Sequence, residues 1–315
     1  MAEQTTNTFR EDLPKLYGDW GVDSEIGKLR SVLMRRPGKE IENITREDSE
    51  RLAFVMTDGD DYDPELVRKQ HDEVARIYRE NGVQVNYVEE MDESCPNAMF
   101  CRDLVLGTPE GVIMARPGIA VRVPEVKYAA QAAAKLGVPI IKTVNGTGTF
   151  DGACVFWIDR ETVIFGTGTR CNQSGYDQVS EELYNMGVKN IYTLSIPRRL
   201  KHLDGMLSIA DHDVALAFSR STPEIVYEAL EKRGFRVLEI PTLEERDNLA
   251  ANLVALEPGK VLMPAGNPLT KKLLTEAGVE CIEVDISEIK KGGGALHCIT
   301  AFLKRDPVPV YPVKE

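Results

Sequence analysis

The sequence predicts a mixed α/β domain built from repeated units, each with several strands and one helix. Short runs typical of β-strands recur along the whole chain of 315 residues, and amphipathic segments typical of helices separate several of them. The strand-like runs outnumber the helical segments by more than two to one, whereas a doubly wound sheet needs nearly one helix for each strand. The helical segments recur on the scale of about 63 residues, one fifth of the chain.

The strand-like runs are short, rich in apolar and β-branched residues, and bounded by turn residues. They cover residues 29–34, 83–88, 103–107, 111–115, 138–144, 154–159, 162–167, 190–196, 214–219, 236–241, 261–265, 281–286 and 298–303.

Residues 63–81 form the clearest helical segment, because its apolar side chains fall along one side of a helix and Asn81-Gly82 stops it. That side carries Leu66, Val67, His71, Val74, Ile77 and Tyr78. Four further helical segments cover residues 126–137, 174–187, 222–234 and 267–278. Each ends near a glycine and runs on into a predicted strand, so helices and strands alternate along the chain.

The composition predicts one ordered domain over residues 1–315. The chain is 43% hydrophobic and 28% charged, which is too apolar for intrinsic disorder. No Pro/Gly/Ser-rich linker or low-complexity tract divides it. Residues 43–64 are acidic and only weakly periodic, which indicates a mobile loop or a short helix beside an opening.

Charge and hydropathy exclude several classes of partner. A net charge of -12 without a basic patch argues against nucleic acid, whose phosphates are held mainly by clustered Lys and Arg. No apolar run approaches the roughly 20 residues that cross a bilayer, and the N-terminus lacks the apolar core of a signal peptide. The six cysteines form no CxxC pair and no Cys/His cluster, so neither disulfides nor structural zinc is expected. We therefore expect a cytoplasmic protein without a membrane partner.

Four segments place reactive side chains next to turn or glycine signals, where a strand meets a loop. Such positions hold side chains rigidly and leave them open to a pocket. They are residues 97–105 with Asp103, 147–156 with Asp151, 199–207 with His202 and Asp204, and 292–300 with Cys298.

Together these side chains suit a flat cation. Asp103 and Asp204 can each accept paired N–H donors from a guanidinium group. A thiolate at Cys298 can attack the central carbon, and His202 can protonate the leaving nitrogen and then deprotonate the next nucleophile. Asp151 would orient His202 and stabilise its charge. Gly292 to Gly294 would let the backbone fold tightly and adopt positive φ, which brings Cys298 to the substrate.

Each residue also has a plainer interpretation. Taken singly, Cys298 is typical of a packed core cysteine, Asp103 of a helix cap or salt-bridge partner, and His202 of a surface histidine. In a strand, His297 would point away from Cys298, so we expect it to be structural.

Several motifs, in order along the chain, resemble the guanidino-modifying branch of the pentein superfamily: arginine deiminases, dimethylarginine dimethylaminohydrolases and amidinotransferases. Residues 29–41 resemble the opening strand of arginine deiminases, and residues 63–85 resemble their first long helix. "FCRDLV", "FGTGTRCN", "HLDGML" and "GGGALHCI" resemble the family's Thr-Arg-Asp, Arg-Thr-Asn, His-x-Asp and terminal His-Cys motifs.

The resemblance implies a five-bladed α/β propeller of ββαβ units. It implies Cys298 as the nucleophile of a covalent intermediate, His202 as acid and base, and Asp103 and Asp204 as guanidinium clamps. Arg122 and Arg170 stand where related enzymes keep arginines for the substrate carboxylate. It further implies a small guanidino substrate. Because the charge of that substrate makes its carbon electrophilic, we expect no metal and no organic cofactor, and a homo-oligomer is compatible with these expectations.

One departure keeps two activities open. Hydrolases of this group usually carry Glu-Gly-Gly-Asp where this chain has "DGAC", so Asp151 and Cys154 replace acidic residues. A shorter Asp here resembles amidinotransferases. The favoured prediction is a hydrolase that acts on arginine or on a substituted, for example N-methylated, arginine. The alternatives are an amidinotransferase that passes the amidino group to an amine and a non-catalytic pentein binding protein.

Overall fold

Five three-stranded sheets make up the architecture of the computed structural model, which describes residues 6–42, 44, 62–197 and 200–314. In each sheet an antiparallel pair of strands is followed by a helix and by a third strand parallel to the second. This ββαβ order confirms the predicted α/β fold class and the five-bladed arrangement. Residues 45–61, most of the predicted loop over 43–64, lie outside the described residues.

Four blades follow one another along the chain. The first of them contains β3 Val105–Thr108, β4 Gly111–Met114, α4 Glu125–Lys135 and β5 Ile140–Thr143, and the next contains β6 Val155–Asp159, β7 Thr162–Thr167, α5 Gln173–Asn185 and β8 Asn190–Ser195. The last two contain β9 Leu207–Asp211, β10 Val214–Ala217, α6 Glu224–Glu231 and β11 Arg236–Glu239, and then β12 Val254–Glu257, β13 Lys260–Pro264, α8 Pro268–Glu276 and β14 Glu280–Val284.

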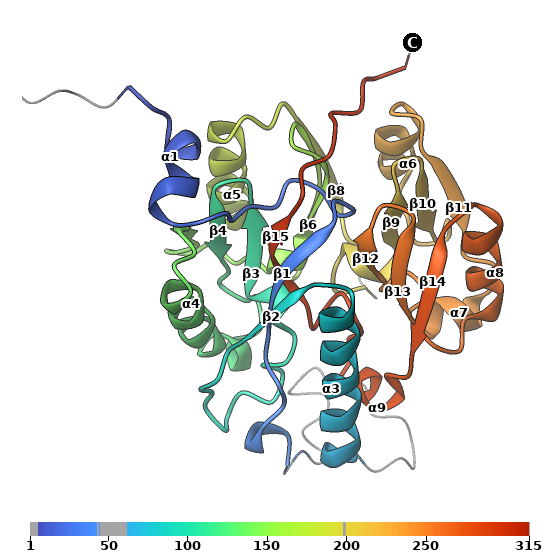
Figure 1. Cartoon of the computed structure of the whole chain (residues 1–315), viewed down its shortest axis with the longest axis horizontal. Coiled ribbons are helices and arrows are strands. Elements are labelled where there is room, and N and C mark those ends of the chain that lie inside the picture. Colours follow the sequence, from blue (N-terminus) through green and yellow to red (C-terminus); the bar gives the residue numbers. More distant parts are fainter. Residues whose placement is uncertain (1–5, 43, 45–61, 198–199, 315) are drawn as a thin grey trace, which may run out of the picture.

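The remaining blade joins the two ends of the chain. It combines β1 Leu29–Met34, α3 Pro64–Glu80 and β2 Gln84–Tyr87 with β15 Ala301–Arg305. Strand β15 pairs antiparallel with β1, so the last strand of the chain closes the ring on the first blade. In Figure 1, β15 lies beside β1 near the centre of the molecule.

Short helices complete the fold. They are α1 Phe9–Leu16, α7 Leu243–Asp247 and α9 Ser287–Lys291, with single 3-10 turns η1 Lys39–Ile41, η2 Cys101–Asp103, η3 Ala120–Arg122, η4 Gly152–Cys154 and η5 Leu203–Gly205. Within the described residues, no helix combines the length and the apolar character needed to cross a membrane.

Helix α3 shows how local sequence sets an element. Asp63 caps it by accepting hydrogen bonds from the backbone N–H groups of Glu65 (3.0 Å) and Leu66 (3.1 Å), and Pro64 occupies the first turn, where its missing N–H costs nothing. The helix stops at Asn81, and Gly82 follows with φ 78°, the left-handed conformation that ends many helices.

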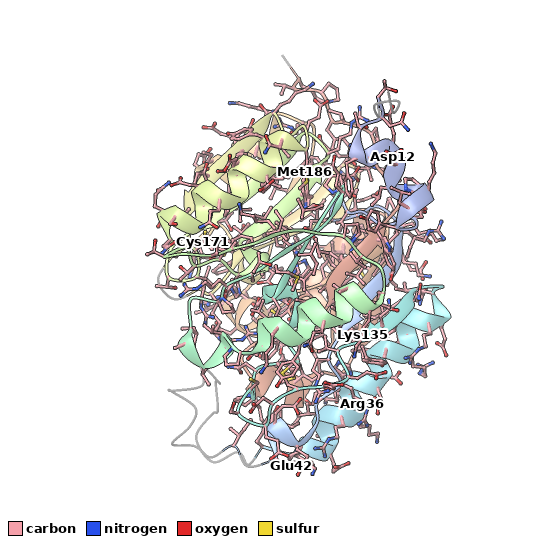
Figure 2. All side chains as sticks on the ribbon, turned by 90° about the vertical axis from the view of Figure 1, so that its left-hand side faces the viewer. Asp12, Arg36, Glu42, Lys135, Cys171 and Met186 are labelled. Carbon is pink, nitrogen blue, oxygen red and sulfur yellow. The ribbon has the colours of Figure 1, made fainter. Side chains whose placement is uncertain are left out.

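The apolar core lies between the sheets and under the helices. The helices of the blades lie around the outside of the ring (Figure 1), and Figure 2 shows two of them, α4 ending at Lys135 and α5 followed by Met186, on the face turned to the viewer. Strand β6 is buried at every position, because it is covered on both faces. Within it, Trp157 donates a hydrogen bond of 3.0 Å from Nε1 to the Gly107 carbonyl of the neighbouring blade.

The structure adds the short helices α1, α7 and α9 to the predicted elements, shifts several boundaries by a few residues, and differs most from the predicted strands at three places. Strands β9 and β12 were not among the predicted runs, and β15 begins at Ala301 instead of residue 298. All three are the first strands of their blades, and the residues just before them form turns. These turns carry polar side chains, which interrupt the run of apolar residues by which a strand is recognised in the sequence.

Candidate active site

Five loop segments at equivalent places in the five blades carry the polar side chains of one site. Each segment directly precedes the first strand of a blade. The residues concerned are Asp103 before β3, Asp151 before β6, His202 and Asp204 before β9, Asn252 before β12, and Cys298 before β15. Because the first strands lie nearest the centre of the ring (Figure 1), segments far apart in sequence meet there.

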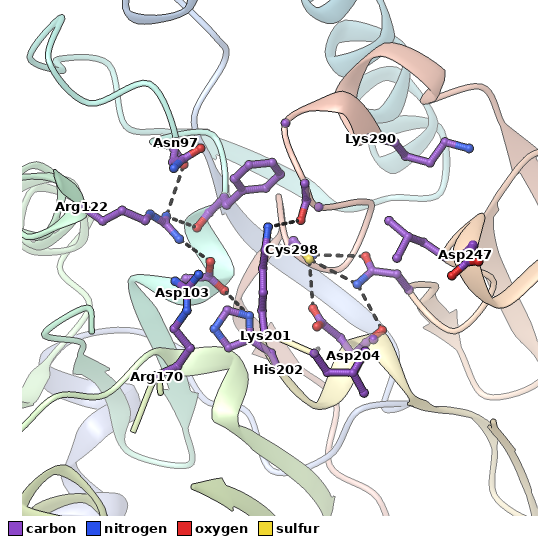
Figure 3. A pocket seen from close by; sticks show the side chains of 18 of the residues that line it. Asn97, Asp103, Arg122, Arg170, Lys201, His202, Asp204, Asp247, Lys290 and Cys298 are labelled. Atoms are coloured by element: carbon purple, nitrogen blue, oxygen red, sulfur yellow. Dashed lines mark hydrogen bonds and ion pairs between the residues drawn. The ribbon is translucent and has the colours of Figure 1, made fainter. Parts of the chain in front are cut away.

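The structure brings all seven predicted site residues together. The cavity holds about 240 Å³, enough for a small molecule. Six of the seven line it, namely Asp103, Arg122, Arg170, His202, Asp204 and Cys298. The seventh, Asp151, is fully buried and reaches the site through His202. In Figure 3, Arg122 and Arg170 lie on one side of Cys298, and Lys290 and Asp247 on the other.

The thiol of Cys298 is held between two polar side chains. Its Sγ donates a hydrogen bond to Oδ2 of Asp204 at 3.1 Å and accepts one from Nδ2 of Asn252 at 3.2 Å. Burial raises the pKa of Cys298 well above its usual value, and the negative charges of Asp204 and Asp103 raise it further. A positive charge beside the sulfur would therefore favour ionisation of the thiol.

His202 lies between two carboxylates. Its Nε2 is 2.9 Å from Oδ2 of Asp151, and its Nδ1 is 3.4 Å from Oδ1 of Asp103. Burial lowers the pKa of His202, but the charges of Asp103 and Asp151 outweigh burial and raise it above the usual value. The two carboxylates thus favour the protonated imidazole, which is the form that a general acid needs.

Asp151 holds its charge although no part of it is exposed. Burial raises the pKa of Asp151, but hydrogen bonding and charge from His202 and the charge of Arg170, whose Nη1 lies 3.2 Å away, outweigh burial and lower it. The shorter Asp at this position thus reaches the histidine directly. Cys154, the other departure from the hydrolase motif, is buried in the core, and its backbone N–H donates to the Asp151 carbonyl.

Arg122 lines the cavity while bound to partners inside the protein. Its guanidinium group donates to Oδ2 of Asp103, to Oε2 of Glu125 at 3.0 and 2.8 Å, and to the carbonyls of Asn97 and Phe100. Arg122 therefore positions the Asp103 carboxylate. Oδ1 of Asp103 accepts no hydrogen bond from the described residues.

Several residues at the site were missed from the sequence, among them Asn252 and Glu25, and His297 was misread. Asn252 bonds the Cys298 thiol, and Glu25 lies behind the site; both are far from any motif. His297 was expected to point away from Cys298. Instead residues 296–299 form a turn, and His297 Nδ1 lies 3.2 Å from Oδ2 of Asp204. Asn252 precedes β12 as the other site residues precede their strands, so its position in the repeat is the signal that identifies it.

The glycines before Cys298 act mainly by allowing close approach. Of the three, only Gly293 has positive φ, at 86°. A Cβ at Gly294 would lie 2.5 Å from Cε1 of Phe100 and 3.1 Å from Cβ of Cys298, so no side chain fits.

We expect Gly294→Ala to lower kcat/KM at least about tenfold, because a shift of 1 Å in a reacting group can cost as much as 10²-fold. Steady-state kinetics with a thermal melt of the same sample checks this. An unchanged kcat/KM in a folded variant would show that the thiol tolerates the displacement.

Asp103, Asp151 and His202 form the one group among the described residues whose ligand atoms lie close enough together to hold a metal ion. These atoms already face one another across the contacts described above, with His202 between the two carboxylates. The predicted independence from metal ions stays a prediction.

Comparison with known proteins supports the fold and a hydrolase that acts on guanidino groups. Residues 55–305 match the family model described as N,N dimethylarginine dimethylhydrolase, eukaryotic. The arginine deiminase of Mycoplasma capricolum subsp. capricolum is 25% identical, in an alignment that covers 90% of this chain and 97% of the deiminase.

Two solved structures share the fold. A dimethylarginine dimethylaminohydrolase mutant from Pseudomonas aeruginosa, complexed with citrulline, is similar with a TM-score of 0.72 and 23% identity, over 87% of this chain and 99% of that one. The N-terminal domain of ArgZ, an arginine dihydrolase of Cyanobacteria, was solved covalently bound to a reaction intermediate. It is similar with a TM-score of 0.74 and 19% identity, over 89% of this chain and 99% of that one.

Proposed function

Because the chain belongs to the eukaryotic N,N dimethylarginine dimethylhydrolase family, we propose that it hydrolyses a guanidinium C–N bond of arginine or of an N-substituted arginine, such as a methylarginine. The reaction passes through an amidino group bound covalently to Cys298. One observation carries the proposal: a thiol, an imidazole and two carboxylates face the same small cavity.

Asp103 and Asp204 bind the guanidinium group of the substrate. Both carboxylates are buried, and a buried anion is costly unless a cation accompanies it. Oδ1 of Asp103 has acceptor capacity that the described residues leave unused, and a planar guanidinium offers N–H donors in the plane that a carboxylate prefers. Arg122 and Arg170, on one side of the thiol, are the proposed contacts for the substrate carboxylate.

Substrate binding activates the nucleophile. The Cys298 thiol resists ionisation because burial and the nearby carboxylates raise its pKa. A guanidinium held beside it supplies the opposing charge, which favours loss of the thiol proton to solvent. The bound cation thus favours the thiolate that attacks it.

In the first half-reaction, the Cys298 sulfur forms a bond to the central guanidinium carbon, and one C–N bond breaks. The departing nitrogen takes a proton from His202, whose Nδ1 is held only loosely by Asp103 at 3.4 Å. The products are a neutral amine or ammonia and an amidino group on sulfur. Asp151 keeps the imidazole oriented throughout.

In the second half-reaction, water adds to the same carbon while His202 accepts one of its protons. The C–S bond then breaks, which releases a ureido product and restores the thiol. The sum is one water consumed and one amine or ammonia released. Transfer to an amine acceptor would share the first half-reaction and differ only in the second nucleophile. Membership of a hydrolase family favours water, and it argues against a non-catalytic binding protein.

The proposal is tested by incubating the protein with arginine and with methylarginines, with and without glycine or lysine. Products are identified by mass spectrometry. Citrulline formed without an acceptor supports hydrolysis. Ornithine that appears only with an acceptor, together with a new guanidino compound, would replace hydrolysis by amidino transfer. No turnover of any of these guanidines would contradict the proposed substrate class.

We expect activity to be unchanged after dialysis against EDTA, since the charge of the substrate makes its carbon electrophilic and His202 supplies the proton. Initial rates before and after dialysis, with the metal content of the protein measured alongside, check this. Loss of activity that Zn²⁺ or another divalent ion restores would show that Asp103, Asp151 and His202 hold a metal.

A further inference from the structure

We propose that His297 is a permanently charged imidazolium that positions Asp204 for the reaction at Cys298. This inference rests on the proposed function for its catalytic meaning, but the charge state of His297 can be measured independently of turnover. The chemistry assigned above to His202 leaves His297 without a role.

Both ring nitrogens of His297 face carboxylate oxygens. Nδ1 lies 3.2 Å from Oδ2 of Asp204, and Nε2 lies 3.1 Å from Oε2 of Glu25. A neutral imidazole carries one N–H group and one lone pair, so it can donate to only one of them. The other nitrogen would then direct its lone pair at a carboxylate oxygen. The geometry is therefore satisfied by the doubly protonated ring.

The two carboxylates are themselves held in the ionised form. Oε1 of Glu25 accepts hydrogen bonds of 3.3 Å from Arg102 and from the backbone N–H of Trp157. Oδ2 of Asp204 accepts a hydrogen bond from the Cys298 thiol. Burial raises the pKa of both acids, but Arg102 and His297 outweigh burial at Glu25, and His297 outweighs it at Asp204, so both values are lowered. In the pairs His297–Asp204 and His297–Glu25, the proton between the two groups is therefore bound to the imidazole nitrogen.

Aromatic rings and buried charged groups enclose the ring of His297. The ring stacks on Phe156, with centroids 4.9 Å apart, and meets the edge of Phe302 at 5.3 Å. The charged groups around it are Glu25, Asp204, Arg102 and Arg305, all buried, and Cys298 is its chain neighbour. Burial lowers the pKa of His297, yet its bonds to Asp204 and Glu25 outweigh burial and raise it.

This arrangement matters to the thiol because Asp204 Oδ2 is shared. The same oxygen accepts from His297 Nδ1 and from Cys298 Sγ. His297 therefore fixes the carboxylate that orients the thiol and that clamps the substrate. When the thiol ionises, it lies beside the Asp204 anion, and the fixed positive charge of His297 opposes that repulsion. The contacts Glu25–His297–Asp204–Cys298 thus form a continuous chain from a buried carboxylate to the nucleophile.

The test compares wild-type protein with His297→Gln, which removes the charge, and with His212→Gln as a matched control. His212 is exposed and bonds Tyr311, away from the cavity. The first readout is the rate of alkylation of Cys298 by iodoacetamide against pH, without substrate. The second is steady-state kinetics.

For His297→Gln we expect the pH at which Cys298 becomes reactive to rise, because a nearby positive charge is lost. We also expect kcat/KM to fall roughly 10- to 100-fold, the effect of losing one hydrogen bond between charged groups. The control should change neither. An unchanged alkylation profile, with only a lower melting temperature, would reduce His297 to a structural residue and overturn the proposal.

The charge state is measured in the unaltered protein, which covers the case in which the variant fails to fold. The chain has four histidines, so ¹⁵N-histidine spectra can be assigned with single-site variants of the other three. Both nitrogens of His297 should stay protonated through neutral pH. A neutral tautomer at pH 7 would overturn the proposal, whatever the enzyme turns over. Failure of the guanidine assays with an imidazolium at His297 would instead count against the proposed function.

Discussion

Cys298→Ser should abolish turnover, with kcat lowered at least ~10⁴-fold, since removing the nucleophile of a covalent mechanism leaves only binding and electrostatic contributions. A serine hydroxyl can still donate to Asp204 but is far less acidic than the thiol, so a bound guanidinium cannot ionise it. Steady-state kinetics of arginine and methylarginine hydrolysis measure the loss.

The matched control is Cys281→Ser. Cys281 lies in β14, is partly exposed and does not line the cavity, so its substitution should leave kcat within a factor of about two. Binding separates chemistry from folding: Cys298→Ser should still take up the substrate in calorimetry, because Asp103 and Asp204 remain. A variant with normal rates would remove the proposed mechanism entirely.

If the reaction passes through a covalent intermediate, the adduct should be detectable on the wild-type enzyme. Protein quenched with acid during turnover should be heavier by one amidino group, located on the peptide that contains Cys298. The Cys298→Ser protein treated in the same way should show no added mass. An adduct on Cys154 or Cys171, which are buried near Asp151, would move the nucleophile to another thiol.

The site could be predicted from the sequence as far as its motifs extend. Four of the site residues stand at the edge of an apolar run, namely Asp103, Asp151, His202 and Cys298. A reactive side chain at the end of a predicted strand can be recognised from the sequence alone. In the structure these four residues meet at one site because the same loop segment of each blade faces the centre of the ring. From the sequence, the expectation of a shared site rested on the resemblance of these motifs, in order, to one enzyme family.

The residues that tune the site could not be found in this way. Glu25 and Asn252 act through hydrogen bonds to His297 and Cys298 across 272 and 46 positions of sequence. No local pattern encodes such pairings. His297 was misread because strand alternation was applied to residues 296–299, where the three preceding glycines in fact lead into a turn. Glycines that allow close approach also remove the periodicity on which such a prediction depends.

For Arg122, the sequence predicted the place of the residue but not its partners inside the protein. The resemblance assigns it to a substrate carboxylate, and it does line the cavity, but only the structure reveals that Asp103 and Glu125 already bind it. Glu125 stands three residues further on, at the start of α4, and looks like an ordinary acidic residue of a first helical turn. Burial raises its pKa to about 7, so its charge depends on the arginine beside it.

Asp151→Asn should lower kcat by roughly 10²- to 10⁴-fold, the range that general acid–base catalysis contributes, and should leave KM within about threefold. Asp151 touches His202 and Arg170 but does not line the cavity, so it supports the chemical step rather than substrate binding. An amide can turn its oxygen or its NH₂ group toward Nε2, but it cannot supply the charge that favours the imidazolium.

The pH profile identifies the cause of that loss. The carboxylates of Asp103 and Asp151 raise the pKa of His202, so the general acid stays protonated to a higher pH than a free histidine would. Removing the charge of Asp151 lowers that pKa, and the fall in kcat with rising pH should begin at a lower pH in the variant. Asp213→Asn, in an exposed pair with Arg236, is the control and should leave the profile unchanged. An effect confined to KM, with an unshifted profile, would contradict the role of Asp151 as the partner of the acid.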